Sequence, residues 1–150
     1  MTQARTQTLT PYIIVRGAAE AIDFYKRAFG AEETMRLTDP TGRIGHAEIK
    51  IGGTPLMLSD EHPEFGALGP VSLGGTPVKL HLTAADADAV AARAVEAGAT
   101  LLRPVQDQFH GNRSGTIADP FGHQWFISQE IEQLSSEEMQ QRYSQELQKG

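Results

Sequence analysis

The chain of 150 residues contains no cysteine. This absence excludes disulfide bonds, thiolate metal sites and a cysteine nucleophile, so any metal must be held by His, Asp or Glu. The chain also lacks the run of about 18 apolar residues that a membrane-spanning helix needs. Its first ten residues, MTQARTQTLT, are polar and lack the apolar centre of a secretory signal. We therefore expect a cytoplasmic protein without a membrane partner.

Positive charge is scarce and scattered. The sequence has 13 Lys and Arg against 19 Asp and Glu, which gives a formal net charge of -6. Because nucleic-acid binding requires grouped basic residues, we expect no nucleic-acid partner. The sequence also lacks a Walker loop, a dinucleotide glycine fingerprint and a nucleophile elbow, which disfavours nucleotide-dependent chemistry and serine hydrolysis. The expected partner is a small molecule.

The sequence does contain an internal repeat, with an offset of about 70 residues. In the first half, the extended apolar segment PYIIV precedes a helical pattern, AAEAIDFYKRAF, that stops at Gly30. In the second half, VKLHL precedes the pattern ADADAVAARAVEA, which stops at Gly98. Glycine in this position is typical of a helix C-terminus. Strand patterns and a hairpin follow each helix, so each half is predicted to be a βαβββ module.

Two turns set the predicted strand register. The glycine pair Gly52-Gly53 is typical of a two-residue hairpin and pairs Ile51 with Thr54 and Glu48 with Met57. The segment Asp119-Pro120-Phe121-Gly122 is typical of a type I turn. Taken as a four-residue turn, it pairs Gly115 with Phe126 and Arg113 with Ser128.

We therefore predict an α+β fold in which two βαβββ modules form a curved mixed sheet around a cavity, because each module alone leaves one sheet face bare. The modules span residues 9–62 and 77–132, and a Gly- and Pro-rich linker spans 63–76. A terminal helix over 135–148 is predicted from a capping box formed by Ser135 and Glu138. The alternative is an ordinary α+β domain whose two helices merely look alike.

The repeated plan, with the motifs AIDFYKRAFGAE, GHAEIKIGG and DPFGHQW, resembles the vicinal oxygen chelate superfamily over about residues 9–132. This superfamily includes glyoxalase I, bleomycin-resistance proteins and extradiol dioxygenases. Within it, the chain is most similar to the glyoxalase-like proteins of the phosphonate-operon B type. The resemblance implies the paired βαβββ fold, a cavity and usually a homodimer, but it does not specify the reaction, because one fold hosts many chemistries.

The metal-using members of the superfamily take four ligands from the first and last strands of each module. The resemblance transfers these positions to Thr10, Met57, Lys79 and Phe126. None of these side chains is a good ligand for a divalent cation. We therefore expect no metal at the family positions and no cofactor. The alternative is a divalent metal held by a displaced set, His46, Glu48 and His81.

Strand alternation, with the family positions as a guide, predicts which side chains face the cavity. His46 and Glu48 share a strand face, as a metal-binding or acid/base couple would. For Arg113 the alternative is an ion pair with Asp107 or Asp119. His110 and His123 are expected in solvent and Trp125 in the core. The candidate ligand-binding residues are Tyr12, Glu48, Lys79, His81, Arg113, Gln124 and Phe126.

Two functions fit this set. The first is a homodimeric protein that binds a small organic ligand, expected to be anionic because Lys79 and Arg113 outnumber Glu48 on the predicted face. The second is a metal-dependent lyase, isomerase or dioxygenase that uses His46, Glu48 and His81.

Overall fold

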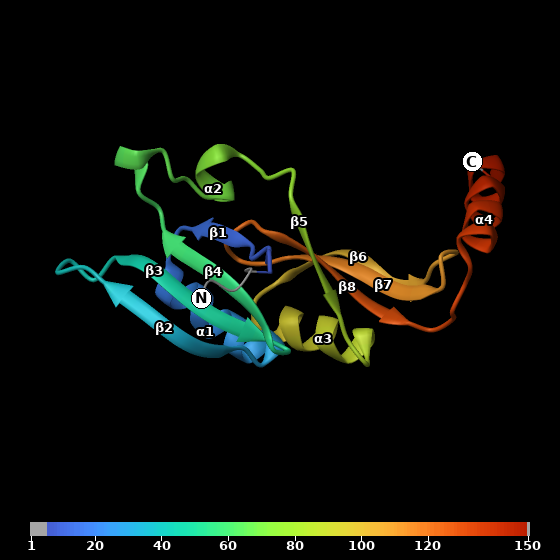
Figure 1. Cartoon of the computed structure of the whole chain (residues 1–150), viewed down its shortest axis with the longest axis horizontal. Coiled ribbons are helices and arrows are strands. Elements are labelled where there is room, and N and C mark those ends of the chain that lie inside the picture. Colours follow the sequence, from blue (N-terminus) through green and yellow to red (C-terminus); the bar gives the residue numbers. More distant parts are fainter. Residues whose placement is uncertain (1–5, 150) are drawn as a thin grey trace, which may run out of the picture.

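The computed structural model describes residues 6–149, so that residues 1–5 of the polar N-terminal stretch lie outside the described part. The predicted α+β fold with two βαβββ modules is confirmed (Figure 1). The first module contains β1 (Tyr12–Val15), α1 (Ala18–Phe29), β2 (Glu32–Thr38), β3 (Ile44–Ile51) and β4 (Thr54–Asp60). The second contains β5 (Lys79–Thr83), α3 (Ala87–Ala97), β6 (Thr100–Asp107), β7 (Asn112–Ala118) and β8 (Gln124–Glu130). Between them lie a short 3-10 turn (Pro63–Phe65) and α2 (Pro70–Leu73), and α4 (Ser136–Lys149) follows.

Both main helices end where the glycines predict. Gly30 adopts a left-handed conformation, with φ of 69°, and its backbone N–H donates to the Lys26 carbonyl oxygen in the last turn of α1. Gly98 occupies the equivalent position at the C-terminus of α3. At the other end of α3, the Asp86 side chain accepts a hydrogen bond from the Ala89 backbone N–H, so this acid has the structural capping role that its position suggests.

The two sheets have the same topology. Their strand orders are β1-β4-β3-β2 and β5-β8-β7-β6, and in each sheet the first strand runs parallel to the last strand of its module. One face of each sheet packs on its own helix, and there Val15, Leu58, Ile117 and Ile127 are fully buried. The two helices also pack on each other. The opposite face of each sheet has no helix over it within the described residues (Figure 1).

The turn between β7 and β8 joins the modules. Its Asp119 is 4% exposed and accepts hydrogen bonds from the Tyr25 hydroxyl on α1, at 2.6 Å, and from the Trp125 indole, at 2.9 Å. Burial, together with the nearby Asp119 carboxylate, raises the pKa of the Tyr25 phenol well above its usual range. His123 is 9% exposed and its Nε2 lies 2.9 Å from the Ile14 carbonyl oxygen. The expectation that His123 lies in solvent is wrong, because the turn is inserted against the first module.

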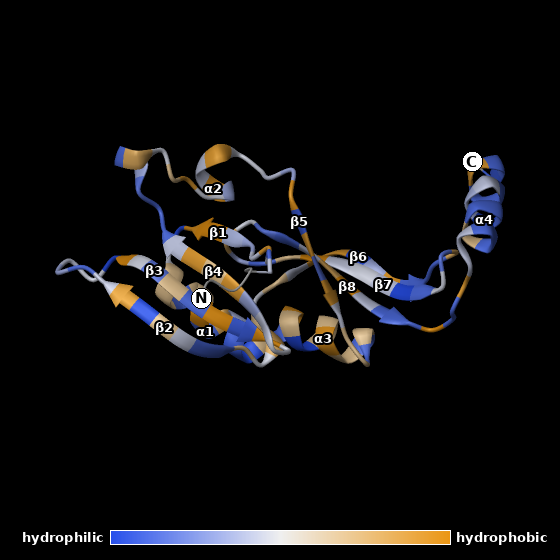
Figure 2. Cartoon of the chain, viewed as in Figure 1, coloured by the Kyte–Doolittle hydropathy of each residue, from blue (hydrophilic) through white to orange (hydrophobic). Residues whose placement is uncertain are grey.

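The terminal helix α4 lies apart from both sheets (Figure 1) and is mostly hydrophilic (Figure 2). Its predicted capping box is confirmed, since Ser135 Oγ accepts from the Glu138 backbone N–H and Glu138 Oε1 accepts from Ser135. Tyr143 stacks on Phe109. None of the helices formed by residues 6–149 is long and apolar enough to cross a membrane.

Candidate functional site

The uncovered face of the first sheet, called here the first open face, presents Tyr12, His46 and Glu48 together. The Tyr12 hydroxyl lies 3.0 Å from His46 Nδ1, and His46 Nε2 lies 2.8 Å from Glu48 Oε2. The predicted register of Ile51 with Thr54, and of Glu48 with Met57, is confirmed. Because paired residues of a sheet point to the same side, this register brings the polar residues of β1 and β3 to one face.

Apolar side chains surround this polar chain. Met35 pairs with Glu48 and Leu37 pairs with His46, and both apolar residues are exposed, by 42% and 58%. Met57 lies beside Tyr12 across the parallel β1–β4 pair. Exposed apolar patches rimmed by polar groups mark binding surfaces. The first open face therefore combines polar side chains with exposed apolar ones.

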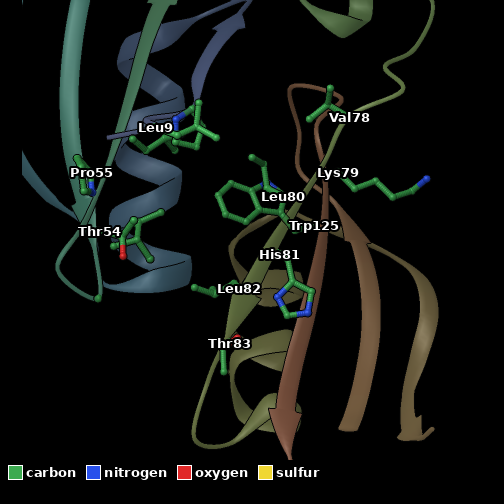
Figure 3. Close-up of a pocket in the computed structure, with 14 residues that line it drawn as sticks. Leu9, Thr54, Pro55, Val78, Lys79, Leu80, His81, Leu82, Thr83 and Trp125 are labelled. Atoms are coloured by element: carbon green, nitrogen blue, oxygen red, sulfur yellow. The ribbon is translucent and has the colours of Figure 1, made fainter. Parts of the chain in front are cut away.

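The second open face is the uncovered face of the sheet formed by β5, β8, β7 and β6. Four residues predicted to share one face of this sheet do so. Leu80 and Trp125 point toward the first module while Lys79 extends to the other side of β5 (Figure 3). His81 pairs with Phe126, and Lys79 pairs with Gln124. The Lys79 ammonium lies 6.0 Å from the centre of the Phe126 ring. Strand alternation thus assigns Lys79, His81, Gln124 and Phe126 to one face.

A cavity of about 280 Å³ lies on the second open face. Arg103 belongs to it because Arg103 pairs with Thr116, which in turn pairs with Phe126. Across residues 6–149, Arg103 forms no ion pair. None of the described residues that line the cavity is acidic. They are His81, Arg103, Gln108, His110, Ser114, Gly115, Thr116, Phe126 and Ser128.

Sequence reasoning missed most of this lining. His110 was expected in solvent, yet it lines the cavity as a half-buried residue. Arg103 lies on β6, whose pairing with β7 has irregular register between Leu101 and Gln106, so simple alternation does not assign its face. The one available signal was that the segment TLLRPVQD carries a single basic residue between apolar ones.

Arg113 does not face this cavity. The predicted pairing of Arg113 with Ser128 is wrong by one residue, because Arg113 pairs with Gln129 and Gly115 pairs with Ile127. A one-residue shift moves a side chain to the opposite sheet face. Arg113 therefore lies on the helix side, where it bonds Asp88 on α3, at 2.7 Å, and Asp107, at 2.9 Å. The alternative of an ion pair with Asp107 is confirmed, whereas Asp119 is not its partner.

The error comes from the turn. His123 belongs to the β7–β8 turn, since the Asp119 N–H donates to the His123 carbonyl and the Asp119 carboxylate accepts from the His123 N–H. Gly122 takes a positive φ of 92°. The turn thus contains one residue more than a four-residue turn, as hairpins with a type I turn and a glycine bulge do.

A larger groove, of about 640 Å³, lies between the modules and is mainly apolar. Leu80, Leu82 and Trp125 point into it from the second module, and Leu9 and Pro55 approach from the first (Figure 3). Lys79, His81 and Thr83, from the other side of β5, also contribute to its lining. The predicted core position of Trp125, which is 4% exposed, is confirmed.

The side chains at the four family positions do not fit the metal centre that the family implies. At the positions transferred from the resemblance, Met57 offers a thioether, Lys79 an ammonium and Phe126 no donor at all, which leaves Thr10 as a lone weak oxygen. The displaced set is not assembled either. Within residues 6–149, no three His, Asp or Glu side chains are grouped as metal ligands, and His81 lies on a different sheet from His46 and Glu48.

Comparisons with known proteins agree with the fold. An uncharacterised protein of Mycobacterium bovis is 44% identical over 135 residues, which cover 88% of this chain and 89% of that protein. The crystal structure of protein PA1353 from Pseudomonas aeruginosa is 26% identical, with a TM-score of 0.68 over 83% of this chain and 98% of that one. A PhnB protein from Bacillus cereus is 18% identical and shares the fold, with a TM-score of 0.63 over 82% and 99% of the two chains.

The family model described as Glyoxalase/Bleomycin resistance protein/Dioxygenase superfamily matches residues 5–127, which include the first module and the second module as far as Ile127 in β8. This match agrees with the repeated βαβββ plan and with the resemblance to the superfamily. The chain belongs to the glyoxalase/bleomycin resistance/dioxygenase superfamily.

Proposed function

We propose that this protein binds a small anionic organic ligand in the cavity of the second open face. The observation that carries the proposal is that Arg103 lines this cavity together with His81 and His110, and that no described residue of the lining has a carboxylate. A guanidinium forms paired hydrogen bonds with a carboxylate, phosphate or phosphonate group. An anion bound there would supply the counter-charge that Arg103 lacks among the described residues.

The remaining lining suits the organic part of such a ligand. Ser114 and Thr116 offer hydroxyl groups, and Phe126 offers an apolar surface. Lys79, which lies over the Phe126 ring, adds a second positive charge at the edge. A few polar groups placed around an apolar surface are typical of small-molecule sites. The cavity volume of about 280 Å³ limits the ligand to a small acid or to the head of a larger one.

We also propose that the functional protein is a homodimer. Within residues 6–149, each sheet has one face without a helix, and the first open face exposes Met35 and Leu37 together with Tyr12. A second copy that covered these faces would bury the apolar side chains and enclose the cavity. Sedimentation at micromolar concentration should show a dimer, and a monomer would contradict this part of the proposal.

Anion binding can be tested with inorganic phosphate, methylphosphonate and benzoate, with benzamide as the neutral analogue of benzoate. At least one anion should raise the melting temperature of the wild type, since a ligand of the native state stabilises it. Arg103→Ala should weaken the binding of that anion by about 1.5–3 kcal/mol, which is the range for hydrogen bonds to charged groups. This corresponds to a loss of affinity of roughly 10- to 150-fold.

Arg113→Ala is the matched control, because it removes an arginine of the same sheet from the opposite face. It should leave anion affinity unchanged. Failure of all three anions to stabilise the wild type would refute the proposal. Equal weakening by Arg103→Ala and Arg113→Ala would show that the cavity is not the site.

A further inference from the structure

The terminal helix α4 lies next to the loop of residues 108–111, which joins β6 to β7 at one end of the molecule (Figure 1). This loop carries His110, which lines the cavity of the second open face. We propose that α4 positions His110 for anion binding in that cavity. The inference rests on the proposed function and adds to it an element that lies outside both βαβββ modules.

Two side chains of α4 hold the loop. The Arg142 guanidinium donates to the Phe109 carbonyl oxygen, at 3.2 Å, and to the Glu132 carboxylate, at 2.8 and 3.1 Å. The Tyr143 ring stacks on the Phe109 ring, with 5.6 Å between the ring centroids. Within residues 6–149, no other side chain of α4 forms a hydrogen bond, ion pair or ring contact with the chain before Ser135. The contacts of α4 therefore act on this loop and on the strand end beside it.

The Phe109 ring links α4 to the cavity. It meets the His110 imidazole edge-on, with 5.2 Å between the ring centroids, and it stacks on Tyr143. His110 directly follows Phe109 in the chain, so the position of the Phe109 ring limits the directions that the imidazole can take. An imidazole N–H can donate a hydrogen bond to an anionic oxygen. Because hydrogen bonds weaken steeply when they are misaligned, this donor is useful only where its direction is fixed.

The backbone of the loop is fixed from the same side. The Gly111 carbonyl oxygen accepts hydrogen bonds from the backbone N–H groups of Ile131 and Glu132, at 2.9 and 3.0 Å. The Glu132 carboxylate in turn accepts from Arg142. Arg142 is thus connected to both ends of the segment 109–111, directly at Phe109 and through Glu132 at Gly111. Arg142, Tyr143 and Phe109 are positioning residues that act through His110.

A role in core stability does not account for these contacts. None of the residues of α4 is buried, and Arg142 is half-buried while the others are exposed. The helix therefore adds little apolar burial to the core. A helix of 14 residues without tertiary packing is marginally stable in water. We infer that order in α4 and order in the loop depend on each other, so that a ligand held by His110 stabilises both.

Anion affinity in variants of α4 tests the proposal, with phosphate, methylphosphonate and benzoate as probes. Tyr143→Ala and Arg142→Ala should each weaken the binding of the anion that the wild type binds most tightly. The expected loss is roughly 2- to 10-fold, as for one hydrogen bond to the ligand. Tyr143→Phe keeps the stacked ring and should bind like the wild type. Lys149→Ala removes a cation of α4 that pairs with Glu146 in the same helix, and it should also bind like the wild type.

A double-mutant cycle tests the route through His110. His110→Ala should itself weaken anion binding, and Tyr143→Ala should cause no further loss in the His110→Ala background, because the imidazole that it positions is absent. The same loss in both backgrounds would indicate a merely structural effect and would overturn the proposal. The melting temperature of each variant shows whether it is folded.

The coupling between the cavity and α4 must be reciprocal. Saturation with the same anion should therefore slow hydrogen exchange of the α4 backbone amides in the wild type by a similar factor. It should leave exchange in the His110→Ala variant unchanged. Exchange of α4 in the wild type that does not respond to the anion would contradict the coupling.

The two proposals fail in different ways. Failure of all three anions to stabilise the wild type would refute anion binding itself, and the role of α4 with it. An anion that binds the wild type and binds Tyr143→Ala or Arg142→Ala equally well would overturn the role of α4 and leave anion binding intact.

Discussion

The chain uses the same turn twice, once at its surface and once between its modules. Both turns have the sequence Asp-Pro-x-Gly, beginning at Asp39 and at Asp119. In each, the aspartate carboxylate accepts hydrogen bonds from the backbone N–H groups two and four residues later. The aspartate N–H donates to the carbonyl oxygen of the residue four positions later. The glycines Gly42 and Gly122 have φ of 91° and 92°. The local sequence therefore determines the turn, whatever surrounds it.

The surroundings determine what else the aspartate does. At the surface, a hydrogen bond from the Thr41 hydroxyl, helped by the backbone N–H groups of Arg43 and Thr41, lowers the pKa of Asp39. Between the modules, Asp119 instead takes hydrogen bonds from Tyr25 and Trp125. The same element is thus a simple turn in one place and the main polar contact between the modules in the other.

The largest expected effect is the loss of Asp119. Asp119→Ala should destabilise the protein by about 2–6 kcal/mol, since it leaves two buried side-chain donors without a partner and each costs about 1–3 kcal/mol. Denaturant unfolding measures the change. Asp39→Ala is the matched control and should cost clearly less, because water can reach the donors of the surface turn. Similar losses in the two variants would show that the turn itself, and not the contact between modules, accounts for the stability.

A smaller effect should separate the two glycines. Gly42→Ala strains the backbone at positive φ, which costs about 1–3 kcal/mol, and a Cβ there would have no atom within 4 Å. Gly122→Ala adds a clash, because its Cβ would lie 2.8 Å from the Pro70 Cβ of α2. We expect it to cost a further 1–3 kcal/mol or so, as overpacking does. Equal unfolding free energies for the two variants would show that α2 gives way without cost.

These two turns also show what the sequence could predict. Helix ends followed from Gly30 and Gly98, and the first hairpin register followed from Gly52 and Gly53, because these signals are local. The register of the second hairpin was wrong by one residue. Its turn extends to His123, and that extension depends on hydrogen bonds that the type I pattern alone does not specify.

The candidate site was predicted in the same uneven way. Lys79 and His81 follow from alternation along a regular strand, and the parity of His46 and Glu48 follows from the correct hairpin register. Arg113 was misplaced by the turn. Arg103 could not be found by alternation, because β6 is irregular beside it. Site residues are thus predictable only where the strands that carry them are regular.

The contact between Tyr25 and Asp119 also bears on how the chain folds. The two residues are 94 positions apart, and the bond between them lies among Trp125, Phe121 and Phe24 in the shared core. Neither repeat can complete its core while the other is unstructured, even though each has all five of its own elements. Unfolding is then cooperative across both repeats, and folding depends on non-local contacts, which slow it relative to a helical protein of the same length. The duplication has produced one folding unit rather than two.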